Sequence, residues 1–235
     1  MTIWKLIKKS YKEIYKNIFS IIAVSTLWFF SAGISIIASY IGIKAKFYFP
    51  IIIALFVVGP VTAQAFYITN KIINYHTIRF VDFWDGLKKY FFKSIAITWL
   101  LGIIVGIITV DFNFFLQSQS KLGKVLIPIY IYILIFLAML VMYIFPLMIE
   151  LSKLGEKNSI VNLFKYAFVL VFKNMVYTLL IFLHLITFGL VNIFLVIALP
   201  VLFIGGISLF ANNATVNLLV KHNIKTEVNG PYQFE

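Results

Sequence analysis

The longest stretch without a charged residue, 174–220, decides the fold: NMVYTLLIFLHLITFGLVNIFLVIALPVLFIGGISLFANNATVNLLV. Its 47 residues are about twice the roughly 20 apolar residues that one membrane-spanning helix needs. Proline disfavours a helix interior and helical geometry in the residue before it, so we expect a break near Leu199 and Pro200. The stretch therefore predicts two membrane spans.

The rest of the chain divides in the same way between its charged residues. Four further charge-free runs contain 27, 24, 17 and 25 residues, and each suits a single span. The sequence thus predicts an all-α, polytopic transmembrane bundle in one domain, 1–222, followed by a short cytoplasmic tail, 223–235. The six expected spans are 18–43, 47–70, 94–110, 125–149, 175–197 and 201–220.

Composition excludes most other classes of protein. Of 235 residues, 62% are hydrophobic and 12% are charged, whereas soluble domains carry about 25% charged residues. A soluble enzyme or a nucleic-acid-binding module is therefore excluded, despite the net charge of +12. The absence of cysteine rules out disulfides and thiolate chemistry, and the first apolar run is too long for a signal-peptide core.

The distribution of basic residues predicts the topology. Alternate connectors hold 16 Lys and Arg on one side and 4 on the other. Since cytoplasmic loops carry the excess of basic residues, we expect both termini to be cytoplasmic. An odd number of spans would destroy this asymmetry.

Segment 78–93, IRFVDFWDGLKKYFFK, has the pattern of an amphipathic cytoplasmic helix. Its aromatic residues share one helical face with Leu87, and its charged residues lie opposite, so we expect it to lie in the headgroup plane. Its mixed charge makes it the candidate surface for a cytoplasmic partner. The candidate partner-binding residues are Phe83, Trp84, Asp82, Asp85, Lys88 and Lys89.

A second connector, 159–173, has Ser159 as a plausible N-cap. It is either another interfacial helix or the beginning of the fifth span. Sliding the sequence by 80 residues aligns YFFKSIAITWL (90–100) with LVFKNMVYTLL (170–180). Because both copies follow a span that contains a proline, this order suggests a parallel internal repeat.

Prolines mark candidate helix kinks at Pro60, Pro146 and Pro200. Gly59 and Pro60 precede Gln64 in the second span. One interpretation is a broken helix whose free backbone groups and Gln64 line a substrate site. The other is an ordinary kink whose polar groups bond to neighbouring helices.

Polar residues inside the last two spans are the remaining candidates. Asn212, Asn213 and Asn217 are costly in lipid and must face the bundle, either as interhelical hydrogen bonds or as the lining of a polar pathway. His184 in the fifth span is either a member of a proton relay or a donor and acceptor that ties helices together.

The sequence predicts no catalytic residue, cofactor or metal. The three histidines, His76, His184 and His222, are too scattered to form a metal site. Paired carboxylates, nucleophile motifs and phosphate-binding loops are also missing, so we expect no enzymatic activity.

Several short motifs resemble the YesL-like family of bacterial integral membrane proteins of unknown function. They are GPVTAQAFY (59–67), FVDFWDGLKKYFFKS (80–94), DFNFF (111–115), FPL (145–147) and NLFKYAFVLVFKN (162–174). The resemblance implies a five- or six-span protein of the bacterial cytoplasmic membrane. It also implies a link to carbohydrate uptake, because such genes commonly neighbour those for carbohydrate ABC transporters.

Two functional hypotheses follow. The first is a non-enzymatic membrane component that acts with an ABC-type transporter, with transporter subunits as partners beside the lipid bilayer. The second is an independent small permease or channel, whose polar path is lined by span six and the kinked span two.

Overall fold

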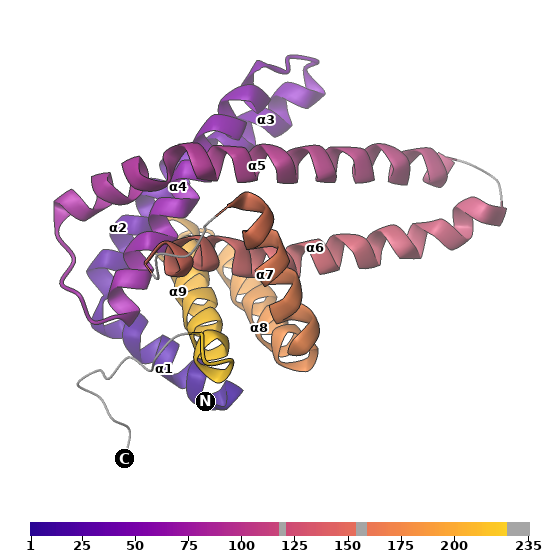
Figure 1. Ribbon diagram of the computed structural model, residues 1–235. Coiled ribbons are helices and arrows are strands. Elements are labelled where there is room, and N and C mark those ends of the chain that lie inside the picture. The colour runs from indigo at the N-terminus through magenta and orange to yellow at the C-terminus, as the bar shows by residue number, and fades with distance from the viewer. Residues whose placement is uncertain (118–120, 154–158, 225–235) are drawn as a thin grey trace.

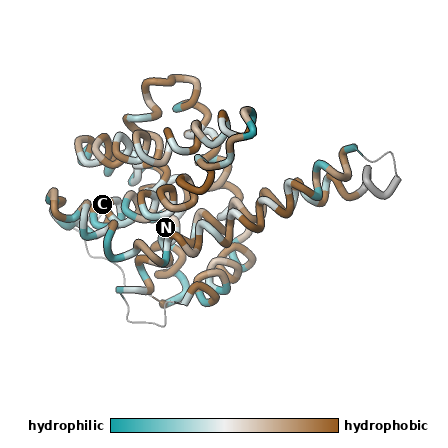
Figure 2. The backbone as a smooth tube through the Cα atoms, turned by 90° about the horizontal axis from the view of Figure 1, so that it is seen from above, coloured by the Kyte–Doolittle hydropathy of each residue, from teal (hydrophilic) through white to brown (hydrophobic). Residues whose placement is uncertain are grey.

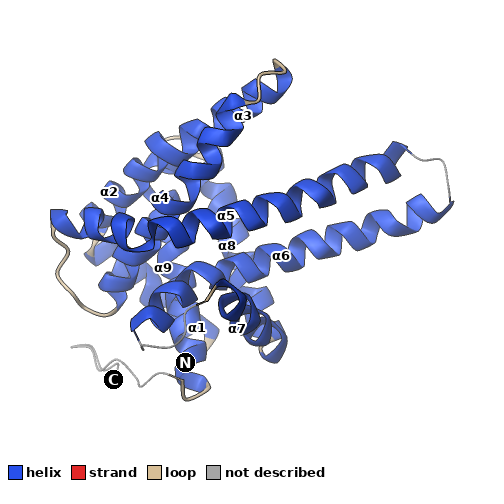
Figure 3. Ribbon diagram, turned by 45° about the horizontal axis from the view of Figure 1, so that its top comes forward, coloured by secondary structure: helices blue, strands red, loops and turns tan. Residues whose placement is uncertain are grey.

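The computed structural model describes residues 1–117, 121–153 and 159–224, and these residues form helices and no strand (Figure 1, Figure 3). Six helical segments are long and apolar enough to cross a membrane, so the predicted all-α polytopic architecture is confirmed. From residue 225 onward, the predicted tail lies outside the described residues.

The first helix was not predicted from the sequence. Helix α1 (Ile3–Lys16) buries Leu6, Ser10, Glu13 and Ile14, and Asn17 is its C-cap. The first span follows in three pieces: α2 (Ile18–Trp28), η1 (Phe29–Gly33) and α3 (Ile34–Lys44). The central piece, η1, is π-helical, a local widening of the helix that is frequent at functional sites.

The second and third spans form a hairpin with one unusually long arm. Helix α4 (Phe49–Ile73) starts with proline in its first turn and continues through Pro60. Helix α5 (Phe80–Gln117) has 38 residues, or about 57 Å at 1.5 Å per residue. It joins the predicted amphipathic segment 78–93 to the third span without a break, so that segment is not a separate helix.

The second half of the chain contains α6 (Lys121–Lys153), α7 (Ile160–Lys173), α8 (Met175–Phe194) and α9 (Ala198–Lys221). Helix α6 continues through Pro146. Helix α7 is separate from α8, and the Ser159 hydroxyl caps it by accepting a hydrogen bond from the Asn162 N–H at 3.2 Å. Segment 159–173 therefore forms a helix of its own and is not the beginning of the fifth span.

The break in the longest apolar run lies slightly before its predicted position. The chain turns at residues 195–197, and α9 begins at Ala198. Pro200 therefore occupies the first turn of α9 rather than the break. Proline is tolerated there because its missing N–H would have no partner within the helix.

Helix α9 is the centre of the bundle and packs against α1, α2, α4, α6 and α8. Around it, the α3–α4 and α5–α6 hairpins diverge in different directions (Figure 1), and the α5–α6 arm is largely apolar (Figure 2). In the most apolar window of α9, 61% of the residues are buried, against 11% in α5. Much of α5 is therefore left to face lipid or a partner.

Glycines permit the closest helix contacts. A Cβ placed on Gly205 would lie 2.9 Å from the Ile21 carbonyl oxygen, and one on Gly59 would lie 2.6 Å from that of Ser94. Helix α9 thus meets the backbone of α2, and α4 meets the backbone of α5. Small residues allow such contacts where no hydrophobic force draws helices together in lipid.

Candidate functional site

The three asparagines of α9 bond to three different neighbours. The Asn212 side-chain N–H donates to the Phe66 carbonyl and the Thr69 hydroxyl of α4, both at 2.9 Å. Asn217 donates to the Tyr177 hydroxyl of α8 at 3.0 Å, and its oxygen accepts from the N-terminal ammonium at 2.9 Å. These amides therefore hold helices together rather than line one face of a pathway.

Asn213 bonds to a buried carboxylate. Its amide donates to Glu13 Oε2 at 2.6 Å and to the Ser10 hydroxyl at 3.0 Å, both on α1. Burial raises the pKa of Glu13, although Lys9, 3.7 Å away, and the Asn213 hydrogen bond oppose this shift. The contact joins residues 200 positions apart and links α1 to α9 at the centre of the bundle.

A second polar cluster lies where the ends of α4, α5 and α6 converge. The Asn70 amide donates to Glu150 Oε1 at 2.6 Å, and the Lys153 ammonium donates to the Asn70 oxygen. Beside them, Lys71 forms an ion pair with Asp82 at 2.7 Å. Asn70 and Glu150 are both fully buried, so the cluster fixes the relative positions of these helix ends.

A third cluster fixes the junction of α7 and α8. Asn174 occupies the junction, where its oxygen accepts from the Lys221 ammonium at 2.9 Å and its amide nitrogen lies 3.0 Å from His222 Nε2. The end of α9 is thereby tied to the start of α8. His222 thus has a structural contact with Asn174. Among the described residues, no group of three or more His, Cys, Asp or Glu could hold a metal ion.

His184 lies in an aromatic cluster rather than a polar one. Its ring packs edge-on against Tyr11 at 5.8 Å and Phe210 at 4.8 Å between ring centroids. Its Nε2 atom is buried and has no hydrogen-bond partner within the described part of the chain. Within the described residues, the contacts of His184 are therefore aromatic.

The Gly59–Pro60 region gives close packing rather than a broken helix. Gly59 and Pro60 are buried and α4 remains helical around them, so the helix is not broken at this point. Gln64, one turn further along, is also buried. Its side chain lines a groove between α2, η1, α4 and the start of α5.

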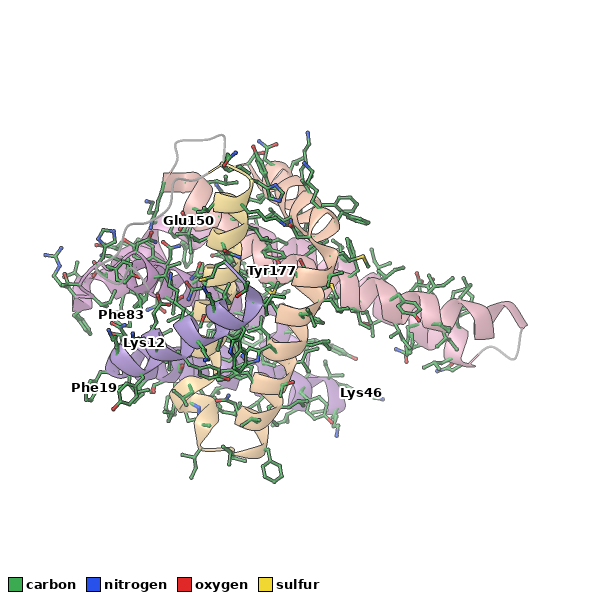
Figure 4. All side chains as sticks on the ribbon, turned by 90° about the horizontal axis from the view of Figure 1, so that it is seen from below. Lys12, Phe19, Lys46, Phe83, Glu150 and Tyr177 are labelled. Carbon is green, nitrogen blue, oxygen red and sulfur yellow. The ribbon has the colours of Figure 1, made fainter. Side chains whose placement is uncertain are left out.

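The start of α5 has a different charge arrangement from the one its sequence suggests. Asp82 is buried, with Lys71 on one oxygen and the Arg79 N–H at 2.8 Å on the other, so it is not free to meet a partner. Asp85, Lys88 and Lys89 are exposed. Trp84 is 58% exposed, and the Lys88 ammonium lies 5.3 Å from its ring centroid. In Figure 4, Phe83 at the start of α5 and Lys46 lie on opposite sides of the view.

Sequence reasoning missed Glu13, Asn70 and Asn174. Glu13 lies in a lysine-rich stretch that was used only to predict the topology. The four-residue spacing of Leu6, Ser10 and Ile14 nevertheless indicates a buried helical face. Asn70 and Asn174 sit at the edges of apolar runs, where a polar residue is expected to be solvated. Only the fold shows that these positions are interior.

Comparison with known proteins gives a family without an assigned activity. Residues 22–112 match the model of a family described as "Protein of unknown function, DUF624". The matched segment runs from α2 into the far part of α5 and includes both Gln64 and the start of α5. This match supports placement in an uncharacterised family. No curated protein and no solved structure matches the chain.

Proposed function

We propose that this integral membrane protein is a non-enzymatic accessory or regulatory component of a transport system. The observation that carries the proposal is the surface at the start of α5, where Trp84 is exposed beside Asp85, Lys88 and Lys89. An exposed aromatic side chain among charges of both signs is typical of a binding surface for another protein. The buried Lys71–Asp82 ion pair holds this surface in a fixed orientation.

The proposed partner is a carbohydrate transporter of the ABC type in a bacterial cytoplasmic membrane. Support for this choice comes from the resemblance to YesL-like proteins and from the predicted cytoplasmic position of the surface. The rival hypothesis of an independent permease has less support. Three of the polar side chains of span six that could line its path, Asn212, Asn213 and Asn217, bond to α4, α1 and α8.

Affinity purification from native membranes tests the proposal. Tagged wild-type protein should co-purify with transporter subunits, and Lys88→Glu/Lys89→Glu should lose them. The matched control is Lys5→Glu/Lys8→Glu on α1, which makes the same charge change, and Lys8 also lies 5.3 Å from a tryptophan ring, that of Trp4. A deletion strain should take up at least one carbohydrate more slowly. Recovery of no transporter subunit, together with unchanged uptake, would refute the proposal.

A further inference from the structure

A groove of about 350 Å³ lies between α2 and η1, the middle of α4 and the start of α5. This volume is within the range of about 300–1,000 Å³ that is typical of small-molecule sites. The walls are almost entirely apolar and include Leu27, Val61, Phe83, Trp84 and Leu87. The π-helical turn η1 borders the groove and contributes Ser31.

One polar group in the wall lacks a partner. Gln64 is only 3% exposed, and no hydrogen bond joins its amide to any other described residue. The neighbouring polar groups are satisfied: the Ser31 hydroxyl donates to the Leu27 carbonyl at 2.5 Å, and the Trp28 indole N–H donates to the Thr62 hydroxyl at 2.9 Å. Because an unpaired amide is costly in an apolar site, Gln64 marks where the polar group of a ligand would bond.

Positive charge surrounds the start of α5, which forms one wall of the groove. The Lys88 ammonium lies over the ring of the groove residue Trp84, and Arg79 and Lys89 are exposed nearby in the chain. Asp82 is already neutralised by Lys71, which leaves Asp85 as the one acid among them. The mouth of the groove therefore favours an anionic group.

We propose that this groove binds an acyl chain of an anionic phospholipid. The apolar walls take the chain, the Gln64 amide donates a hydrogen bond to the ester carbonyl, and Lys88 attracts the phosphate. A carbohydrate does not fit, since its many hydroxyl groups would meet a single free amide. The groove lies entirely within this chain and can be tested without a transporter, although Trp84 and Lys88 also belong to the proposed partner surface.

Photo-crosslinking of the purified protein in nanodiscs tests this site. Phosphatidylglycerol with a photoreactive acyl chain is added at trace level to phosphatidylcholine, and labelled residues are mapped by mass spectrometry. We expect label on Leu27, Val61 and Phe83. Gln64→Leu keeps the volume and removes the amide, and it should lower this label about fivefold, the equivalent of one neutral hydrogen bond. Val61→Phe should abolish it by filling the groove.

The matched control is Val105→Phe, which adds the same ring to an exposed position of α5 and should leave the groove label unchanged. A phosphatidylcholine probe should label the groove less than phosphatidylglycerol does. Equal groove labelling in wild type, Gln64→Leu and Val61→Phe would overturn the site, and equal labelling by the two lipids would overturn its preference for anions. If Val61→Phe does not fold, Gln64→Leu alone decides. No transporter is present, so failure here leaves the proposed function standing.

Discussion

At the scale of residues, the polar side chains inside the bundle act as specific connectors. Successive helical residues differ by about 100°, so Asn212 and Asn213 must face different neighbours, whereas Asn213 and Asn217 lie about 40° apart. This accounts for the bond of Asn212 to α4 and for the bonds of the other two toward α1 and the N-terminus. The sequence predicted that the asparagines face the bundle. It could not name Glu13 as a partner, because that contact depends on how α1 folds back.

Replacing Asn213 by leucine should destabilise the protein. The change removes the hydrogen bonds to Ser10 and Glu13 and leaves a buried carboxylate without its donor, at a cost of about 0.6–2 kcal/mol. The control is Asn113→Leu on α5, where the exposed amide donates to the Thr109 carbonyl of its own helix. The unfolding temperature in detergent should fall for Asn213→Leu and stay level or rise for Asn113→Leu. A rise for Asn213→Leu would contradict the bundle-facing role.

Glu13 should make stability depend on pH. Because burial raises its pKa in the folded state, the folded protein binds the proton more tightly than the unfolded chain does. The contribution of Glu13 to the free energy of unfolding should therefore be greatest below about pH 4.3, the ordinary glutamate pKa, and fall as the pH rises through the raised value.

Glu13→Gln should remove this fall, since glutamine keeps an oxygen that accepts from Asn213 and carries no charge. Thermal unfolding of both proteins across this pH range measures the difference. Asp85→Asn, at an exposed position, serves as the control and should retain the wild-type slope. Parallel curves for wild type and Glu13→Gln would show that this carboxyl group is not responsible.

At the scale of elements, the close contact of α4 with α5 depends on Gly59. A Cβ there would lie 2.6 Å from the Ser94 carbonyl oxygen, so Gly59→Ala must push the helices apart, at a cost of about 1–3 kcal/mol. The control is Gly106→Ala, where a Cβ would meet nothing within 4 Å. Unfolding temperatures in detergent should fall for Gly59→Ala and not for Gly106→Ala. Equal stability of the two variants would mean that the helices adjust without strain.

The elements were largely predictable because charge and apolar length are local properties. Each of the six helical segments that are long and apolar enough to cross a membrane overlaps a charge-free run, and the N-cap at Ser159 was predicted from its residue type. Junctions were harder, because they depend on tertiary contacts. The helix of segment 78–93 continues into the third span, whereas the equivalent place in the second half breaks at Asn174, which is held by Lys221 and His222. The internal repeat therefore stays a prediction, with halves that differ in shape.

At the scale of the whole molecule, polarity is concentrated at one end of the helices. The ends of α4 and α6 and the start of α5 meet in the Asn70–Glu150 and Lys71–Asp82 contacts, and the end of α9 meets the start of α8 through Asn174. These ends adjoin the four connectors rich in lysine. The opposite connectors carry few charges in the sequence, and the α3–α4 and α5–α6 helix pairs diverge in different directions (Figure 1). The end with these polar contacts is thus the one expected in the cytoplasm, and the opposite end is the one expected outside.

The absence of cysteine allows a direct test of this orientation. Single cysteines replace Lys46 and Phe194 at the outer turns, and His76 and Ser159 at the inner connectors; all four positions are exposed. A membrane-impermeant maleimide added to intact spheroplasts should label the first two, because the excess of basic residues retains the other two in the cytoplasm. The inner pair should react only after lysis, which also verifies that those cysteines are reactive. Labelling of the inner pair in intact spheroplasts, with the outer pair protected, would reverse the topology and remove the start of α5 from the cytoplasmic side.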